Sequence, residues 1–306
     1  MSGLVSLPAS LAPVGGERSK EASVSVRKVL VGGAGQMGAG IAQVAAQAGL
    51  DVVMTDIADE FIVHGMAIIE KGLGKQVEKG KLQAAERDAA LARIVTGTDL
   101  SIGKDADLFI EAVPETLELK KGVLERAGAV LGPEAILATN TSSLSVSRLA
   151  ALTSRPARFV GIHFFNPVPL MTLVEVVKGS ETSDDTVAAA REFCERLGKS
   201  PITVADSPGF VVNRILFPMI NEAAQAFSEG VASAADIDAG MKLGANFPMG
   251  PLALADLVGL DTTKAILESL ERELGDVKYR PSAVLGELVS AGRLGRKTGA
   301  GFHTYS

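Results

Sequence analysis

From residue 27 onward, apolar and polar positions follow the pattern of alternating strands and helices. The apolar run KVLVGG (28–33) ends in glycine, an alanine-rich segment with helical spacing follows (37–49), and DVVMTD (51–56) is apolar again. A strand, a helix and a strand within about thirty residues form a βαβ unit, which implies a parallel sheet. The same pattern predicts further strands at DLFIEAV (107–113) and AILATN (135–140), two helices within 58–93 and one near 115–131.

The pattern changes in the second half of the chain. FVGIHFF (159–165) and TLVEVVK (172–178) are strand-like runs joined by NPVPLM, which favours an antiparallel hairpin over another crossover. A helix (184–197) and a short strand (200–204) follow. Beyond the SPG break at 207–209, every predicted element is a helix: 209–229, 233–243, 250–258, 261–274 and 282–291. We therefore predict an α/β domain with a Rossmann-type parallel sheet over 26–206 and an all-α domain over 207–306.

Residues 1–25 show no sustained periodicity, and we expect them to form a flexible tail. A secretory signal places a positive charge before an apolar core, whereas the first basic residue here, Arg18, follows the apolar part. An organelle signal is the alternative, although such a presequence is richer in arginine and poorer in glutamate.

Composition narrows the function classes. Thirty lysines and arginines against 36 acidic residues give a net charge of −6, which argues against a nucleic-acid-binding protein. No apolar stretch is long enough to span a bilayer, so a membrane protein is not expected. The single cysteine, Cys194, can form neither an internal disulfide nor a cysteine metal site, and a cytoplasmic location is the default.

The first βαβ unit contains a glycine motif between its strand and its helix. Its six residues, Gly33-Ala34-Gly35-Gln36-Met37-Gly38, fit the spacing GxGxxG. Gly33 permits the tight turn, Gly35 lets the backbone approach a pyrophosphate, and Gly38 allows close packing of helix on strand. The N-terminus of the helix presents free N–H groups to the anion. The motif therefore predicts a dinucleotide site.

An acidic residue at the end of the second strand indicates which dinucleotide is bound. Asp56 can hydrogen-bond the adenosine ribose hydroxyls and would repel a 2′-phosphate, which favours NAD over NADP. The alternatives are a glycine-rich turn in some other α/β protein and a Rossmann fold that binds a different nucleotide.

One of the three histidines is a candidate catalytic residue. His64 lies in a polar helix and His303 near the C-terminus, and we expect both at the surface. His163 lies inside an apolar run, where an unsatisfied imidazole is costly. In the register expected for the hairpin, His163 faces Glu175, with Cβ atoms roughly 4.5–5.5 Å apart.

A His163–Glu175 pair suits general base catalysis. The carboxylate can fix the imidazole tautomer and stabilise the imidazolium, while the imidazole takes a hydroxyl proton as hydride leaves for a nicotinamide. A purely structural His–Glu pair in the sheet is the alternative.

At these residues the sequence resembles the L-3-hydroxyacyl-CoA dehydrogenases, and most closely the bacterial 3-hydroxybutyryl-CoA dehydrogenases. The resemblance covers about residues 27–305, and HFFNPV together with DSPGFVVNR is more specific than the glycine motif. It rests on GAGQMG, EAVPE (111–115), NTSSL (140–144), HFFNPV (163–168), LVEVV (173–177), DSPGFVVNR (206–214), MKLGANFPMGP (241–251), DLVGLDTT (256–263) and GRKTGAGF (295–302).

The resemblance implies reversible NAD-dependent oxidation of the 3-hydroxyl of an acyl-CoA, with the thioester in a cleft between the domains. It also implies a homodimer paired through the helical domain. His163 and Glu175 match the family's catalytic pair, while Ser142 and Asn213 match the groups that hold the substrate's hydroxyl and carbonyl. Positions that match contacts to the cofactor are Glu115, Lys120, Asn166 and Lys297.

Each of these roles has a structural alternative. Ser142 could cap the following helix, and Asn213 could simply lie on the first turn of its helix. Lys120 and Lys297 could be solvated surface charges. In the segment 58–93, where relatives are expected to meet CoA, Lys79 matches a CoA-contacting lysine and Gly72 replaces a serine found in some members. Several lysines in this segment could contact the CoA phosphates or could simply form a solvent-exposed face of a helix. They are Lys71, Lys75, Lys79 and Lys81.

Two rival functions keep the same fold. One is a dehydrogenase of a free hydroxy acid or sugar acid, and the other is a non-catalytic NAD-binding protein. The joint presence of His163, Glu175, Ser142 and Asn213 argues against the second. A chain of this size suggests short acyl groups, such as 3-hydroxybutyryl-CoA.

Overall fold

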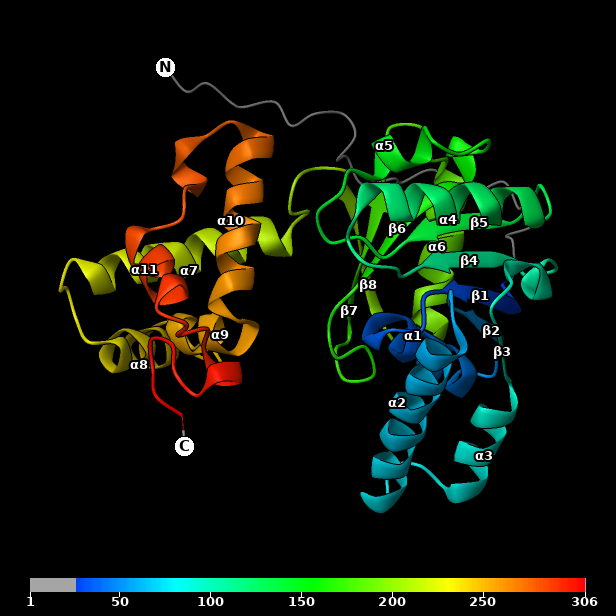
Figure 1. Ribbon diagram of the computed structural model, residues 1–306, viewed down its shortest axis with the longest axis horizontal. Coiled ribbons are helices and arrows are strands. Elements are labelled where there is room, and N and C mark those ends of the chain that lie inside the picture. Colours follow the sequence, from blue (N-terminus) through cyan, green and yellow to red (C-terminus); the bar gives the residue numbers. More distant parts are fainter. Residues whose placement is uncertain (1–25, 306) are drawn as a thin grey trace.

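One eight-stranded sheet forms the centre of the N-terminal domain, in the order β3-β2-β1-β4-β5-β6-β7-β8 (Figure 1). The computed structural model describes residues 26–305, so the tail predicted for residues 1–25 lies outside the described residues. β6 and β7 are antiparallel, and the other neighbouring pairs are parallel. The strands are β1 (Lys28–Gly32), β2 (Asp51–Thr55), β3 (Ile94–Gly97), β4 (Leu108–Glu111), β5 (Ile136–Thr139), β6 (Phe159–Phe164), β7 (Leu173–Lys178) and β8 (Ser200–Ala205).

Helices cover both faces of this sheet, which explains why its central strands are apolar throughout. Val29 and Val31 of β1 pack on one face with α1 (Gln36–Gln47) and α6 (Asp184–Arg196). Leu30, between them, packs on the other face with α4 (Leu117–Val130) and α5 (Val146–Ala150). This alternation along a strand gives the domain two apolar layers, one on each side of the sheet.

Strand β3 is absent from the sequence-based prediction. Its four residues form the edge of the sheet, and Val95 is 56% exposed. Such a short and half-exposed run lacks the continuous apolar character by which the buried strands are recognised. The expectation that 58–93 contains two helices is confirmed by α2 (Asp59–Glu78) and α3 (Ala84–Ala92), which project from the domain as an arm (Figure 1).

The hairpin prediction is confirmed, including its register. β6 and β7 pair antiparallel, and His163 stands opposite Glu175. The sheet therefore brings two polar side chains together in the middle of otherwise apolar strands.

The residues after β8 form a helical domain with a core of its own. Phe217, Leu252, Leu267 and Leu285 are among its buried residues. In the described range no helix is both long and apolar enough to cross a membrane. The helices are α7 (Val212–Ser228), α8 (Ala234–Gly244), α9 (Pro251–Val258), α10 (Leu260–Leu274) and α11 (Ala283–Ser290).

Helix α7 begins at Val212 and not at residue 209, where the sequence pattern places its start. Gly209 and Phe210 have φ angles of 74° and 48°, so the backbone there is left-handed and cannot belong to a right-handed helix. The N–H groups of Val211 and Val212 each donate to Glu175 of the sheet. A carboxylate distant in sequence thus determines where this helix starts.

The C-terminal segment is anchored by buried carboxylates of α8 and α9. Asp256, 1% exposed, accepts the N–H groups of Phe302 (2.9 Å) and His303 (2.8 Å) and the hydroxyl of Tyr305 (3.0 Å). Nε2 of His303 lies 2.7 Å from Oδ2 of Asp238. His303, which we expected at the surface, is half-buried, and its imidazole is held by Asp238.

We expect Asp256→Ala to lower the free energy of unfolding by about 3 kcal/mol, because it leaves buried donors of the C-terminal segment without an acceptor. Urea unfolding measures the loss, and faster proteolysis after α11 locates it. Glu222→Ala, at an exposed position of α7, is the matched control and should change stability by less than about 0.5 kcal/mol. Equal stability of both variants would contradict the anchoring role of Asp256.

Candidate active site

The glycine motif forms the turn between β1 and α1. Gly33 has a φ of 113°, and a Cβ there would lie 2.6 Å from the carbonyl oxygen of Ala112. A Cβ on Gly38 would lie 1.8 Å from the carbonyl oxygen of Gly33, so this close approach of helix and strand requires glycine. Gly35, in contrast, has no atom within 4 Å of its Cβ position and is exposed. The backbone is therefore open where a pyrophosphate would approach.

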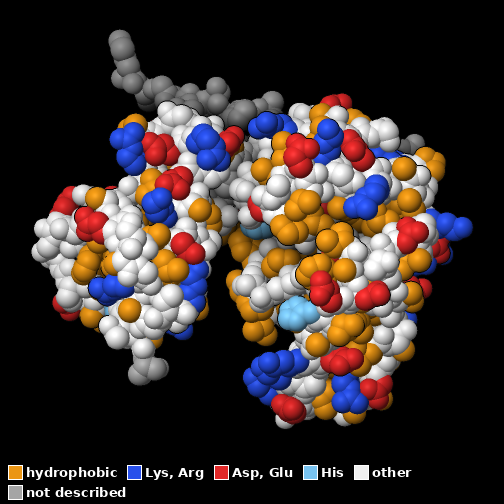
Figure 2. Space-filling view, in the orientation of Figure 1, with side chains coloured by type: hydrophobic (Ala, Val, Ile, Leu, Met, Phe, Trp, Pro, Cys, Tyr) orange, Lys and Arg blue, Asp and Glu red, His pale blue; other side chains and the backbone are white. Residues whose placement is uncertain are grey.

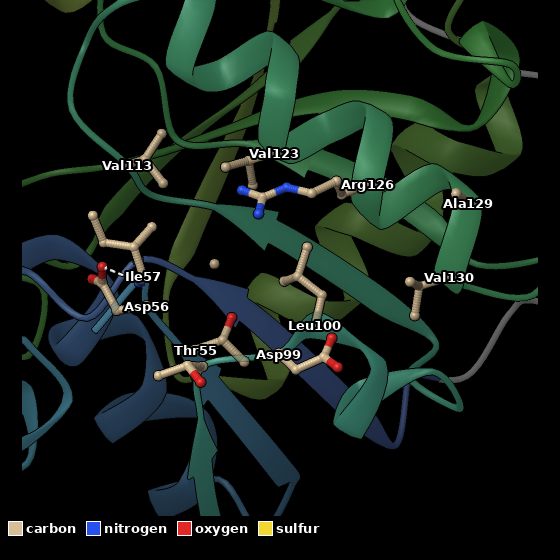
Figure 3. A pocket seen from close by; sticks show the side chains of 13 residues that line it. Thr55, Asp56, Ile57, Asp99, Leu100, Val113, Val123, Arg126, Ala129 and Val130 are labelled. Carbon is tan, nitrogen blue, oxygen red and sulfur yellow. Dashed lines mark hydrogen bonds between the residues drawn. The ribbon is translucent and has the colours of Figure 1, made fainter. Parts of the chain in front are cut away.

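A cleft of about 490 Å³ lies beside this turn (Figure 3). Asp56 follows β2 and lines the cleft, and its carboxylate accepts the N–H groups of Ala34 and Ile57, both at 2.7 Å. The residues that line the cleft are Gly32, Gly33, Thr55, Asp56, Ile57, Thr98, Asp99, Leu100, Val113, Val123, Arg126, Ala129 and Val130.

These residues fit the adenosine half of NAD. No side chain caps the N-terminus of α1, so its first N–H groups are available to an anion. The two backbone hydrogen bonds hold the Asp56 carboxylate in the cleft, where it suits ribose hydroxyls and disfavours a 2′-phosphate. The open backbone at Gly35 leaves room for the pyrophosphate, and the mostly apolar cleft suits the adenine ring.

His163 and Glu175 form a buried pair. Nδ1 of His163 lies 2.8 Å from Oε2 of Glu175, and the two residues are 6% and 0% exposed. The rings of Phe165 and Phe210 pack beside the imidazole, with centroids at 4.6 and 5.5 Å. Because Nδ1 is engaged, Nε2 is the ring nitrogen left to exchange a proton with a substrate.

The Glu175 carboxylate is held in its charged form. Burial by itself raises the pKa of this group, but hydrogen bonds from His163 and from the N–H groups of Val212 and Val211 bring the pKa below its ordinary value. Its two oxygens have different partners: Oε2 faces His163, while Oε1 accepts both N–H groups at the start of α7, each at 3.0 Å. Asn213, half-buried, lies on that first turn.

Glu115 organises the loop that carries Ser142. Its Oε1 accepts the N–H of Ser142 (2.8 Å), the N–H and hydroxyl of Ser143 (both 3.0 Å) and the hydroxyl of Thr141. Burial raises the pKa of Glu115, yet the charge of Lys120 and these hydrogen bonds lower it to about 2. Ser142 does not cap the following helix, because Ser145 is the N-cap of α5 and accepts the N–H of Arg148.

Lys120 is buried and is not a solvated surface charge. It is 1% exposed, and its Nζ lies 2.8 Å from Oε1 of Glu111 and 3.1 Å from Oε2 of Glu115. Glu111, fully buried at the end of β4, also accepts the hydroxyl of Thr139 at 2.6 Å. Lys120 thus neutralises a buried carboxylate and holds Glu115 at the same time.

The other predicted site residues lie in three places. The Gln36 amide donates to Oδ1 of Asn166 at 3.0 Å, which joins the glycine turn to the loop after β6. Met37 follows on the first turn of α1. Lys297 lies in the helical domain, where it forms an ion pair with Asp261 at 2.6 Å, and no hydrogen bond joins it to the nucleotide cleft within residues 26–305.

Lysines gather at the free end of the helical arm, where Figure 2 shows blue side chains over the end of α2. Lys79 directly follows α2 and is exposed. Lys71, Lys75 and Lys81 are exposed as well. Gly72 lies among them against α1, and a Cβ there would approach Oε1 of Gln43 to 2.6 Å.

The structure adds residues that the sequence analysis does not identify. The sequence does offer a signal for Glu111, because it is an acidic residue at the end of an apolar strand. The other residues of that strand are all buried. Asn140, whose Oδ1 accepts the N–H of Phe164 at 2.9 Å, fixes the backbone beside His163. Arg126, on the wall of the cleft, has no sequence signal, because it lies on the polar side of a helix like any solvated arginine.

The fold and the cleft define a dinucleotide-binding protein of the Rossmann class. Residues 28–207 match the family described as 3-hydroxyacyl-CoA dehydrogenase, NAD binding domain, and residues 209–305 match its C-terminal domain. The chain therefore belongs to the 3-hydroxyacyl-CoA dehydrogenase family. It is an oxidoreductase of this family, with NAD as its cofactor.

The names of similar proteins support this family assignment. The chain is 55% identical over 273 residues to a probable 3-hydroxybutyryl-CoA dehydrogenase of Deinococcus radiodurans, covering 89% of this chain and 98% of the relative. It is 42% identical to the human mitochondrial hydroxyacyl-coenzyme A dehydrogenase, covering 94% and 95%. The crystal structure of (S)-3-hydroxybutyryl-CoA dehydrogenase from Ralstonia eutropha superposes with a TM-score of 0.90 at 52% identity, covering 92% and 100%.

We expect Glu115→Gln to destabilise the protein at neutral pH, by an amount that shrinks in acid. The folded-state pKa of about 2 lies below the ordinary 4.5, so the charged form adds stability above pH 4.5 that is lost as pH falls toward 2. Chemical unfolding of both proteins at successively lower pH measures the difference. Glu118→Gln, exposed on α4, is the control, and a difference that stays constant between pH 4.5 and 2 would refute this role.

Proposed function

We propose that this protein catalyses the reversible NAD-dependent oxidation of (S)-3-hydroxyacyl-CoA to 3-oxoacyl-CoA, with 3-hydroxybutyryl-CoA as the short-chain substrate. The observation that carries the proposal is the buried His163–Glu175 pair, whose carboxylate also holds the first turn of α7. Relatives of 46–55% identity are named 3-hydroxybutyryl-CoA dehydrogenases or probable ones, which supports the acyl-CoA substrate.

His163 acts as the general base. In the oxidising direction its Nε2 takes the proton of the 3-hydroxyl, and the charged Glu175 stabilises the imidazolium that forms. In the reducing direction the protonated imidazole returns the proton to the same oxygen. NAD, when bound, accepts the hydride from C3 of the substrate. The apolar rings of Phe165 and Phe210 limit the access of water to the imidazole.

Ser142 and Asn213 orient the substrate from two sides. Glu115 accepts the N–H of Ser142 at 2.8 Å and its hydroxyl at 3.5 Å, and from this long hydrogen bond the hydroxyl turns to contact the 3-oxygen. Asn213 reaches the substrate from the helical domain, because Glu175 holds its helix next to His163. Fixing the alcohol between these groups lowers the entropic part of the barrier. Contacts from both domains support a thioester that lies between them.

The remaining cofactor and substrate contacts follow from the positions already described. The backbone of Gly33–Gly38 would hold the pyrophosphate and Asp56 the adenosine ribose. Asn166, bonded to Gln36 of the glycine turn, and Glu115 would contact the rest of the cofactor, and the buried Lys120 would act by holding Glu115. The lysines of the arm, Lys79 among them, attract the CoA phosphates. Lys297 reaches the cofactor only if the helical domain approaches and its ion pair with Asp261 opens.

The chief rival is a dehydrogenase of the same fold that acts on a free hydroxy acid. We expect rapid oxidation of NADH with acetoacetyl-CoA and little with free acetoacetate, because the arm lysines and the interdomain cleft act on the CoA moiety. The loss of NADH absorbance measures both. Equal turnover of the thioester and the free acid would support the rival.

We expect His163→Ala to lower kcat by roughly 10²–10⁴-fold, the usual contribution of a general base. Glu175→Gln should lower kcat as well, because an amide does not stabilise the imidazolium. His64→Ala, at an exposed position of α2, is the matched control and should retain wild-type activity. Binding of NADH by each variant shows that the fold is intact. Activity that survives the loss of His163 would exclude it as the base.

We also propose a homodimer formed through the helical domain, and a cytoplasmic location, in which the buried free Cys194 remains reduced. Of α8, only Ala234 and Asp238 are buried, and Leu243 near its end is 87% exposed. Phe247 and Ile215 are also exposed, at 37% and 66%. So much apolar surface on one small domain is typical of an interface.

Leu243→Asp should convert the dimer to a monomer, because it places a charge in an apolar interface. Sedimentation velocity measures the mass in solution. Val63→Asp introduces the same change at an exposed position of α2 (68% exposed) and should leave the dimer intact. A wild-type monomer, or a dimer that tolerates Leu243→Asp, would contradict the proposed interface.

A further inference from the structure

Arg126 forms part of the nucleotide cleft, and no carboxylate of the described residues pairs with its charge. It lies on α4 and lines the cleft, and its Nε donates to the carbonyl of Gly122, one turn earlier, at 3.2 Å. Within residues 26–305 it forms no ion pair with a carboxylate. Figure 3 shows the guanidinium directed across the cleft, away from the Ala129 and Val130 end of the helix.

The wall across from Arg126 carries an exposed apolar side chain. Ile57, directly after Asp56, is 76% exposed although it lines the cleft. Figure 3 shows Asp56 and Ile57 on the side toward which the guanidinium points, and Leu100 below Arg126 in the same view. An isoleucine and a planar cation on facing walls leave a slot whose two sides both suit a flat aromatic ring.

We propose that Arg126 binds the adenine ring of NAD, with its guanidinium stacked on one face of the ring and Ile57 against the other. The inference rests on the cofactor part of the proposed function and extends it to a residue of α4. It makes α4 a part of the cofactor site, besides its role in packing on the sheet.

Stacking on the adenine ring explains the position of the Arg126 guanidinium better than a contact with the phosphates of NAD does. The open N–H groups at the start of α1 already provide an anion site, and the backbone of Gly35 beside them is open to the approach of a pyrophosphate. Carboxylates near Arg126 are occupied by backbone donors: Asp56 by Ala34 and Ile57, and Asp99 by Ser101. A guanidinium in a mostly apolar cleft is suited to the face of a base.

The test is a binding titration that needs no CoA substrate. Since the chain contains no tryptophan, the fluorescence of NADH reports binding without energy transfer from that residue. We expect Arg126→Leu and Arg126→Lys each to weaken NADH binding by roughly five- to tenfold, since lysine keeps the charge but lacks the planar group. Lys121→Gln removes a charge from the same helix outside the cleft and should bind NADH like the wild type.

Fragments of the cofactor locate the contact. Adenosine and ADP-ribose, as competitors of NADH, should each lose affinity for the Arg126 variants by the same factor, while reduced nicotinamide mononucleotide should bind all variants equally. A loss for ADP-ribose without one for adenosine would place Arg126 on the phosphates and overturn the proposal. Wild-type affinity in Arg126→Lys would overturn it too, because charge alone would then suffice.

The NADH-binding test of Arg126 can be interpreted separately from the test of the proposed reaction. A protein that binds NADH but does not turn over acetoacetyl-CoA would contradict the function proposed above and leave the Arg126 result interpretable. A wild-type protein that does not bind NADH would overturn both. Arg126 is exposed, so its variants should unfold at the wild-type temperature, and thermal unfolding checks this.

Discussion

One carboxylate, that of Glu175, connects the sheet, the imidazole and the helical domain. One of its oxygens engages His163, and the other accepts the N–H groups of Val211 and Val212. Because the carboxylate is fully buried, removing either set of partners would leave one of its oxygens without a hydrogen bond in an apolar environment. The orientation of the His163 imidazole and the start of α7 therefore depend on each other. A movement of the helical domain that broke the α7 contact would also change the charge environment of His163.

A second carboxylate, Glu115, has a similar role in the loop that carries Ser142. It holds the loop of Ser142 through backbone and hydroxyl donors, and it is itself held by Lys120, whose charge Glu111 balances. Both sides of the site thus use buried or partly buried anions that accept several N–H groups. Such groups fix a loop more firmly than packing alone, because each lost hydrogen bond costs the desolvation of its donor.

Much of this arrangement is predictable from the sequence, and the exceptions have physical causes. The βαβ pattern, the hairpin and its His163–Glu175 register follow from period-two and helical spacing, which are local properties. The start of α7 does not, because it is set by Glu175, distant in sequence. Strand β3 is too short and too exposed to stand out. Arg126 resembles any solvated arginine until the fold places it on the wall of a cleft.

The close approach of α2 to α1 restricts which residues can stand at position 72. At Gly72 the nearest neighbour is the amide of Gln43, which is 2% exposed and bonded to Gln47 on its own helix. Any side chain at 72, serine included, needs the space that the Gln43 amide occupies. A serine at position 72 therefore fits only if the Gln43 amide turns aside, which alters its hydrogen bond to Gln47, or if position 43 holds a smaller residue. The residues that positions 43 and 72 can accept thus depend on each other.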